Sequence, residues 1–283
     1  MQAAEMFKNC MALSMQIRRE WKISSIYLSK AEQKKHWLLW ITGWSMFPTD
    51  KKEGSVMARL YPQKVYGRMR RIRDSHGEFV KDVNGKCYLV RDQTKIKFDN
   101  TEKLIATVFM TNPGSYGFDR LDSWGDFVSG IGEETELKGW GYPDPTMRNV
   151  IWAIQRAYDR IGYSKPEGYV RIFNTSNIVC PKGENVEHYH DEVKNHVEEN
   201  EGDFLSEPFE DSCMEESPIV MIGFLKDKFE QEVRSLEARL KPFQEKIVCA
   251  KIQDWPAHPV NWVRKAHLGE EIINKLVIRL NKQ

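Results

Sequence analysis

The order of apolar and polar residues changes character along the chain. Residues 6–21 carry apolar side chains at helical spacing, which predicts an amphipathic helix, and a tryptophan-rich stretch follows it. Between residues 57 and 98 the apolar runs become short and alternating, and the turn sequences Asp74-Ser75-His76-Gly77 and Asn84-Gly85 interrupt them. This second pattern predicts antiparallel β-hairpins.

After residue 100, continuous apolar runs alternate with helical stretches. Residues 103–110 form an apolar, β-rich run that predicts a central strand buried on both faces. A helix is expected from Asp144, an N-cap carboxylate followed by proline, to Gly162, and a charged helix is expected later in the chain. The charged helix spans residues 227–240, and three more strands are expected at residues 169–173, 219–224 and 247–252.

This alternation of strands and helices predicts an α/β protein with a largely parallel sheet. We expect a three-layer α/β/α arrangement around a central, mostly parallel four-stranded sheet, with an N-terminal helical and β-hairpin extension. Residues 1–100 are assigned to the extension. Residues 101–283 are assigned to the α/β domain, which carries an acidic insertion at residues 184–216.

The composition is that of a globular protein. Of the 283 residues 41% are hydrophobic, which is enough for one large core, and the apolar stretches are shorter than the ~20 residues of a membrane helix. The N-terminus lacks the basic-then-apolar order of a signal peptide, so we expect a cytoplasmic protein without membrane contact. Five scattered cysteines without a Cys-x-x-Cys pair argue against a disulfide framework or metal cluster, and no cofactor is expected.

Charge is distributed unevenly although the net charge is only +1. The acidic insertion holds one lysine among thirteen acidic residues, together with His188, His190 and His196. A metal site is one interpretation of these histidines, but a solvated loop or surface helix is the better one, and no metal is predicted. Residues 51–100 are basic instead, and the cations that can grip a DNA backbone there are Arg68, Arg70, Arg71 and Arg73. A solvated strand face has the same composition, so both interpretations stay open.

Three polar clusters stand where predicted strands end. These are Asn112-Pro113-Gly114, Asn174-Thr175 and His258-Pro259. Each alone is more typical of a turn or kink than of a catalytic loop. The carboxyl ends of parallel strands share one edge of a sheet, where α/β proteins bind ligands. We therefore expect an active site at this edge, centred on the turn Thr111-Asn112-Pro113-Gly114-Ser115.

The order of these clusters resembles that of the uracil-DNA glycosylase superfamily. Residues 110–115 are similar to the Gly-x-Asn-Pro-Gly motif of one branch, with the leading glycine replaced, and residues 258–262 are similar to its late His-Pro motif. Asn174 stands where the superfamily has a base-reading asparagine. Residues 144–148, Asp-Pro-Thr-x-Arg, also resemble an uncharacterised bacterial and phage family with an Asn-Pro-Ser-like turn. The resemblance covers about residues 103–262.

The resemblance implies a metal-free DNA glycosylase, a hydrolase that flips a pyrimidine out of DNA and excises it. Asn112 would position the attacking water, and His258, neutral or protonated, would donate to the departing base. Asn174 would read the base edge, and Tyr116 or Phe118 would stack on its face, although a core position suits either ring equally. The complete base-binding set is Gly114, Ser115, Tyr116, Phe118 and Asn174, and further DNA contacts are expected from Arg148, Asn261 and Arg264.

Two departures from the uracil-specific branch carry predictions. That branch has a tyrosine in place of Gly114, which shields the pocket from substituents at the pyrimidine 5 position. Gly114 predicts room for a modified or damaged pyrimidine, such as a modified cytosine, in DNA repair or in defence against phages with modified DNA. The branch also has an aspartate in place of Asn112, so the amide here removes a general base.

Two other functions remain open from the sequence. One is a hydrolase or transferase acting on free nucleotides or nucleosides, which would use the same loops. The other is a non-catalytic nucleic-acid-binding module. We expect DNA as the partner and favour a monomer.

Overall fold

The computed structural model describes residues 61–118, 120–197 and 211–282. The chain divides into two units, Met1–Met57 and Ala58–Gln283, and everything below concerns the second. The helix expected at residues 6–21 lies outside the described residues.

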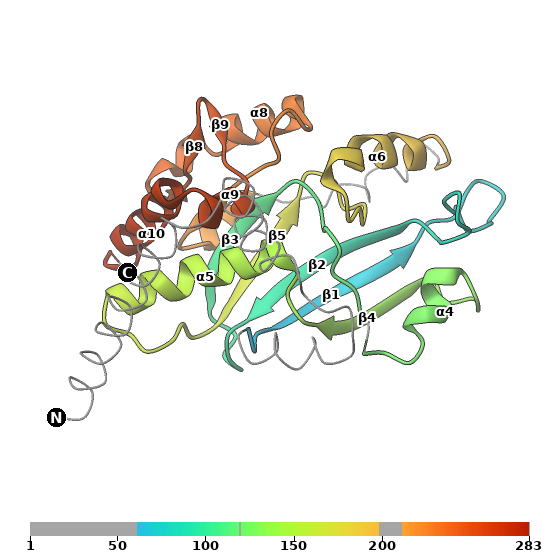
Figure 1. Ribbon diagram of the computed structural model, residues 1–283, viewed down its shortest axis with the longest axis horizontal. Helices are drawn as coiled ribbons and strands as arrows, with labels where there is room; N and C mark the ends of the chain where they lie inside the picture. The colour runs from blue at the N-terminus through green and yellow to red at the C-terminus, as the bar shows by residue number, and fades with distance from the viewer. Residues whose placement is uncertain (1–60, 119, 198–210, 283) are drawn as a thin grey trace, which may run out of the picture. The chain divides into compact units, whose positions relative to one another are not determined.

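A seven-stranded sheet forms the centre of the second unit (Figure 1). Its order is β4-β1-β2-β5-β3-β6-β7. The strands β5, β3, β6 and β7 are parallel, whereas β2, β1 and β4 continue the sheet through antiparallel pairs. In chain order the strands are β1 (Lys64–Arg71), β2 (Leu89–Lys97), β3 (Leu104–Met110), β4 (Glu136–Gly141), β5 (Tyr169–Asn174), β6 (Val220–Ile222) and β7 (Ile247–Val248).

The α/β class and the large, mostly parallel sheet are confirmed, but the expected count of four strands is too small. The expected hairpin pairs directly with the parallel strands, because β2 is hydrogen-bonded to β5 over Thr94–Lys97 and Tyr169–Ile172. The alternating pattern of β1 indicates a strand but does not show which strand it pairs with. The sequence pattern therefore assigned β1 and β2 to an extension, although they belong to the same sheet as the parallel strands. The strand expected at residues 247–252 is also divided, since β8 (Lys251–Ile252) pairs with β9 (Trp255–Pro256) in a second, two-stranded sheet.

The sheet has an apolar cluster on each face. Val108 and Phe109 are neighbours in β3, so their side chains point to opposite faces, and they belong to different clusters. The Val108 cluster includes α5 (Pro145–Arg160), α9 (Pro259–Arg264) and α10 (Ala266–Leu280). The Phe109 cluster includes α8 (Glu230–Arg239) and residues of the α7 helix (Asp211–Glu216). A third cluster packs α6 (Val186–Lys194) beside the start of β2.

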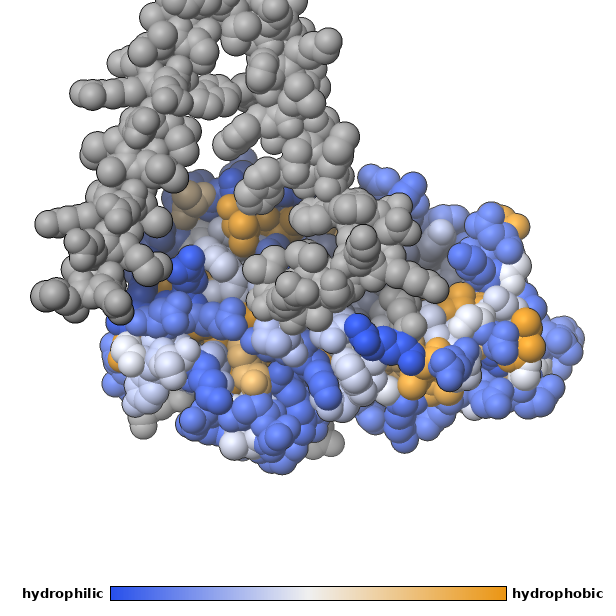
Figure 2. Space-filling view, turned by 60° about the horizontal axis from the view of Figure 1, so that its bottom comes forward, coloured by the Kyte–Doolittle hydropathy of each residue, from blue (hydrophilic) through white to orange (hydrophobic). Residues whose placement is uncertain are grey.

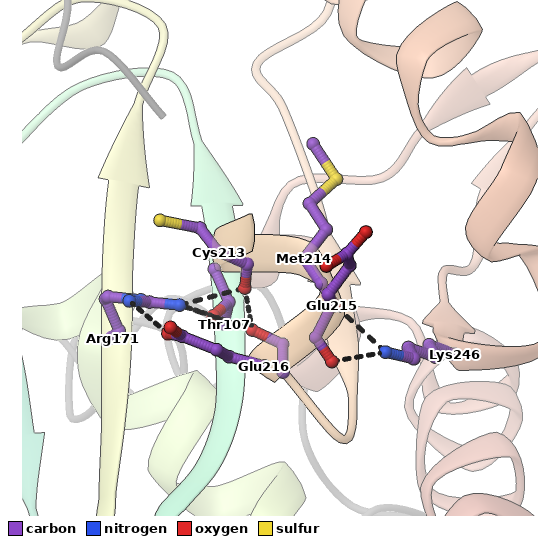
Figure 3. Close-up of polar contacts among 8 residues, drawn as sticks. Thr107, Arg171, Cys213, Met214, Glu215, Glu216 and Lys246 are labelled. Carbon is purple, nitrogen blue, oxygen red and sulfur yellow. Dashed lines mark hydrogen bonds and ion pairs between the residues drawn. The ribbon is translucent and has the colours of Figure 1, made fainter. Parts of the chain in front are cut away.

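Polar contacts attach the short helix α7 to the sheet (Figure 3). Arg171 of β5 donates to the Cys213 carbonyl at 2.9 Å and forms an ion pair with Glu216 at 3.7 Å. Lys246, in the 3-10 helix Lys241–Lys246, donates to the carbonyls of Met214 and Glu215. These cations bind carbonyls at the carboxyl end of α7, where helix carbonyls lack partners within the helix.

The remaining elements lie at the periphery. They are α4 (Trp124–Ser129) and the 3-10 helix Gly183–Asn185. Where described residues are uncovered in Figure 2, hydrophilic surface predominates and hydrophobic areas are small. No helix in the described part of the chain is long and apolar enough to cross a membrane.

Candidate active site

The ends of three parallel strands are hydrogen-bonded to one another around Thr111. The backbone N–H groups of Thr175 and Ser176, after β5, donate to the carbonyls of Met110 and Thr111, each at 2.9 Å. On the other side, the N–H of Leu225, after β6, donates to Thr111 Oγ1 at 2.8 Å. The Asn112 turn therefore lies between the segments that follow β5 and β6.

His258 comes to the same edge from the far end of the chain. Ala257 forms a parallel bridge with Phe224, whose N–H donates to the Pro256 carbonyl at 3.0 Å. Trp262 of α9 is fully buried and donates through Nε1 to the Ala257 carbonyl at 2.8 Å, which holds the segment against α9. The structure thus brings all three strand-end clusters to one edge of the sheet, although Asn112 and His258 are 146 residues apart in sequence.

The Asn112 side chain is half-buried and held by its nitrogen. Nδ2 donates to the carbonyl of Cys180 at 2.9 Å. This bond fixes the amide, so its carbonyl oxygen is the atom that can accept a hydrogen bond from a water.

Asn174 ends β5 and is 6% exposed. It pairs with Met110, and its side chain points to the face of α5, two residues beyond the buried Ile172 of that cluster. Among the described residues, neither Nδ2 nor Oδ1 has a hydrogen-bond partner. An unsatisfied buried amide costs about 1–3 kcal/mol, and a ligand that pairs with both atoms removes this cost.

His258 caps the first turn of α9 and is 9% exposed. Its Nδ1 accepts a hydrogen bond from the Val260 N–H at 3.3 Å. Burial, reinforced by the positive charge of Arg264, lowers the pKa of His258 to about 4. At neutral pH the ring is therefore neutral with its proton on Nε2, and it can act as a hydrogen-bond donor from that atom.

Gly114 faces a buried carboxylate. The residue has φ +66, in the left-handed region, and a Cβ atom added here would lie 2.9 Å from Asp144 Oδ2. Asp144 is 7% exposed and caps α5, accepting the Met147 N–H through Oδ1 at 2.8 Å. Burial raises the pKa of Asp144, opposed by the charge of Arg91. The expected open space beside Gly114 is not there, because the Asp144 carboxylate lies where a side chain of residue 114 would begin.

Arg91 is a site residue that the sequence analysis missed. Its side chain is fully buried, with the guanidinium carbon 4.8 Å from the centre of the Tyr116 ring. Burial lowers the pKa of Arg91 to about 10, while Asp144 and Tyr116 oppose this shift, so the side chain is charged at neutral pH. β2 is antiparallel to β5, and the Arg91 N–H donates to the Asn177 carbonyl at 2.9 Å. The start of β2 is therefore adjacent to the end of β5.

The two candidate stacking rings belong to the hydrophobic core. Tyr116 is 3% exposed and its hydroxyl donates to the Val65 carbonyl. Phe118 is fully buried between Tyr116 and Trp124, with ring centres 5.8 and 5.6 Å away. The expectation that one of them stacks on a base is wrong, because both rings are buried in the core and are not accessible to a base. Ser115, by contrast, is exposed at the turn.

The basic segment of β1 is largely committed to internal contacts. Arg68 and Arg70 form ion pairs with Asp92 at 2.7 and 2.6 Å, on the face of β2 opposite Arg91. Arg71 is 5% exposed, and its guanidinium donates to five backbone carbonyls between Asp126 and Glu134. The DNA-binding role expected of Arg71 is corrected, because all its donors are used inside the protein. Arg73 forms an ion pair with Glu133 at 3.4 Å and lies over the Phe79 ring.

The other expected DNA contacts lie on α5 and α9. Arg148 donates through Nε to the Pro143 carbonyl at 2.9 Å. Asn261 is half-buried, and Arg264 is exposed at the end of α9. Of these three side chains, Arg264 acts electrostatically on His258.

One histidine of the acidic insertion reaches the strand-end region. His190 Nδ1 lies 2.9 Å from Ser176 Oγ, its ring packs on Phe229, and burial lowers its pKa. His188 instead pairs with Glu192, 3.7 Å away, on its own helix. Within the part of the chain that the structure describes, no group of three or more His, Cys, Asp or Glu side chains is placed to hold a metal ion.

A surface hollow of about 470 Å³ lies elsewhere, beside β7 and α10. None of the expected site residues lines it. Four of its charged side chains form pairs, since Lys275 donates to Glu271 at 2.7 Å and Lys251 donates to Glu237 at 3.2 Å. We therefore place the candidate active site at the strand ends, where the buried amide of Asn174 has no partner within the described ranges.

Comparison with protein-family models, curated proteins and solved structures finds no match to this chain.

Proposed function

We propose that the chain is a DNA glycosylase that flips out a pyrimidine base and excises it by hydrolysis, in DNA repair or in defence against phages with modified DNA. One observation carries the proposal: at a strand end, Asn174 presents a buried donor and a buried acceptor that have no partner among the residues that the structure describes. A pyrimidine edge also offers a donor and an acceptor side by side, so it can pair with both atoms.

The neighbouring residues suit the demands of the reaction. Cleavage of the bond between base and sugar develops positive charge at C1′ and negative charge on the base. The neutral His258, with its proton on Nε2, can donate to an oxygen of the departing base without a competing proton equilibrium at neutral pH. Asn112, fixed through Nδ2, can hold the attacking water by its carbonyl oxygen.

The test is base release from a panel of DNA substrates. The protein is incubated with DNA containing uracil, mismatched thymine, 5-hydroxymethylcytosine or glucosylated cytosine, and alkali then reveals abasic sites. We expect cleavage of at least one substrate and a loss of about 100-fold in Asn174→Ala. The matched control is Asn195→Ala, which replaces an exposed asparagine at the end of α6. A folded wild-type protein that leaves all four DNAs intact contradicts the proposal.

The same panel tests whether the enzyme prefers a base modified at the 5 position. Open space beside Gly114 does not support this preference, because Asp144 Oδ2 lies there. Faster release of the two modified cytosines than of uracil is the outcome that supports the preference.

A second candidate, a hydrolase acting on free nucleosides or nucleotides, is favoured by the internal pairing of the β1 arginines. If the protein does bind DNA, cations other than the β1 arginines must contact the phosphates. Arg264 and Lys265 are exposed near His258 and are the candidates. Reversing both to glutamate should abolish a reaction on DNA but leave one on free nucleosides intact. Lys165→Glu, at the opposite edge of the sheet, is the charge control.

A further inference from the structure

The proposed hydrolysis needs a group that the Asn112 turn does not contain. A water that attacks C1′ must give up a proton, and the developing cation on the sugar is stabilised by a nearby negative charge. An amide side chain is neither a base at neutral pH nor an anion. Asn112 can orient the water, so the proton acceptor must come from another element.

Asp144 presents a carboxylate beside the Asn112 turn. The turn approaches this carboxylate so closely that a Cβ on Gly114 would be 2.9 Å from Oδ2. The other oxygen, Oδ1, is occupied by the N-cap bond from Met147. Backbone hydrogen bonds from Met147 and Thr146 therefore anchor the carboxylate, and Oδ2 faces the Asn-Pro-Gly backbone.

A second, independent observation points to a ligand beside this carboxylate. Asn174, 6% exposed and with both amide atoms unpartnered among the described residues, points to the same face of the sheet as α5, which Asp144 caps. Gly114 follows β3, and β3 is the neighbour of β5. A base edge bound to Asn174 would place its sugar near the end of these two strands.

We infer that Asp144 is a further catalytic residue, the carboxylate that accepts the proton of the attacking water in the reaction proposed above, on which this inference rests. One O–H bond of the water breaks and its proton passes to Asp144 Oδ2. The water oxygen forms the new bond to C1′, the bond from C1′ to the base nitrogen breaks, and its electron pair leaves with the base. His258 stabilises that anion by donating from Nε2.

The surroundings suit a carboxylate that exchanges a proton. Burial raises its affinity for the proton, which makes it a stronger base than an exposed aspartate. The buried guanidinium of Arg91, the backbone hydrogen bonds from Met147 and Thr146, and the charge of Arg148 act in the opposite direction and favour the anion. Gly114 has no side chain that would separate the carboxylate from the turn.

The experiment compares Asp144→Asn and Asp144→Ser with the wild-type protein in single-turnover base release. Asparagine and serine are N-cap residues as good as aspartate, so both variants keep the cap of α5 and should unfold cooperatively. We expect each to lose about 100-fold or more in rate. We also expect the fall in wild-type rate at acid pH to disappear in Asp144→Asn. Asp159→Asn, an exposed aspartate of the same helix, should change neither.

Binding of DNA analogues gives a readout that does not depend on turnover. Wild-type protein should bind DNA containing a protonated pyrrolidine in place of the target sugar about tenfold more tightly than DNA containing the neutral tetrahydrofuran analogue. Asp144→Asn should remove that preference, because the cationic ring loses its anion.

The outcomes separate the two ideas. An active wild type whose Asp144→Asn variant keeps its rate and its preference for pyrrolidine overturns the inference and leaves the proposed function standing. A folded wild type that releases no base from DNA or from free nucleosides overturns both.

Discussion

At the scale of single residues, the buried polar groups of this edge are arranged around a short turn. Arg91 is fully buried, Asp144 is 7% exposed and Asn174 is 6% exposed. Taking a charge out of water costs several kcal/mol unless an opposite charge or hydrogen bonds compensate it. Packing alone does not explain the cost of burying two opposite charges beside an amide that has no partner in the described part of the chain. The proposed binding of a ligand would explain it.

Gly114 should tolerate alanine worse than another left-handed glycine does. Gly114→Ala places a Cβ 2.9 Å from Asp144 Oδ2 in addition to the strain of φ +66. Gly85 has φ +75 with nothing within 4 Å of an added Cβ. We expect Gly85→Ala to lower the free energy of unfolding by about 1 kcal/mol and Gly114→Ala by about 2 kcal/mol or more. Urea denaturation measures both, and equal costs would contradict the close approach of the carboxylate.

His258 should make the protein less stable in acid. Its pKa is about 4 in the folded protein, whereas the ordinary pKa of a histidine is 6.5. Between these pH values the unfolded chain therefore binds a proton that the folded chain does not. The free energy of unfolding should therefore fall by about 3 kcal/mol from pH 7 to pH 4 on account of this group. His258→Asn should lose this part of the pH dependence, whereas His267→Asn, exposed on α10, should keep it. Parallel curves for wild type and His258→Asn would refute the shift.

At the scale of secondary-structure elements, the bounds that depend on local sequence signals were predicted best. The strand β3 and the helix α5 begin and end within one or two residues of expectation, because an apolar run, an N-cap aspartate and a terminating glycine are all local. The turn at Asp74 also forms, with the Gly77 N–H bonded to the Asp74 carbonyl at 2.9 Å. The role of Arg71 was not predictable, since its five carbonyl partners lie at least 55 residues away in sequence.

Arg71 should hold the segment from α4 to β4 in place. Replacing it by methionine leaves five carbonyls without their donor, and we expect the free energy of unfolding to fall by about 3 kcal/mol. Hydrogen exchange should accelerate most around residues 126–135. Arg73→Met, which removes an exposed ion pair, is the control and should cost less than about 1 kcal/mol. Unchanged exchange in that segment would show that Arg71 does not anchor it.

At the scale of the whole unit, the sequence located the three polar clusters that the fold brings together but not the full sheet around them. The clusters at Asn112 and Asn174 could be found because each comes at the end of an apolar run, and the cluster at His258 because it comes a few residues after one. Arg91 could not, because it reaches the site through the pairing of β2 with β5, whose residues are about 80 positions apart. Pairing between distant strands depends on the whole fold and leaves no mark in a local pattern.

Two truncations should distinguish the sheet from the expected domain boundary. Residues 58–283 contain all seven strands and the apolar clusters of both faces, so this fragment should unfold in one cooperative urea transition. Residues 101–283 lack β1 and β2, which exposes one side of β5, and should not show such a transition. Tryptophan fluorescence and circular dichroism should coincide for the longer fragment. Cooperative unfolding of the shorter one would mean that the four parallel strands form an independent domain.

The two edge strands bear on how the protein behaves at high concentration. An open sheet edge is a template on which another chain can add a strand and begin to aggregate. β4 carries the paired charges of Glu136 and Lys138 along its exposed side. β7 has only two residues, and directly after it Lys275 of α10 binds the Cys249 carbonyl at 2.6 Å. Neutralising Lys275 would therefore leave the Cys249 carbonyl free beside that edge, and we expect such a variant to self-associate more readily.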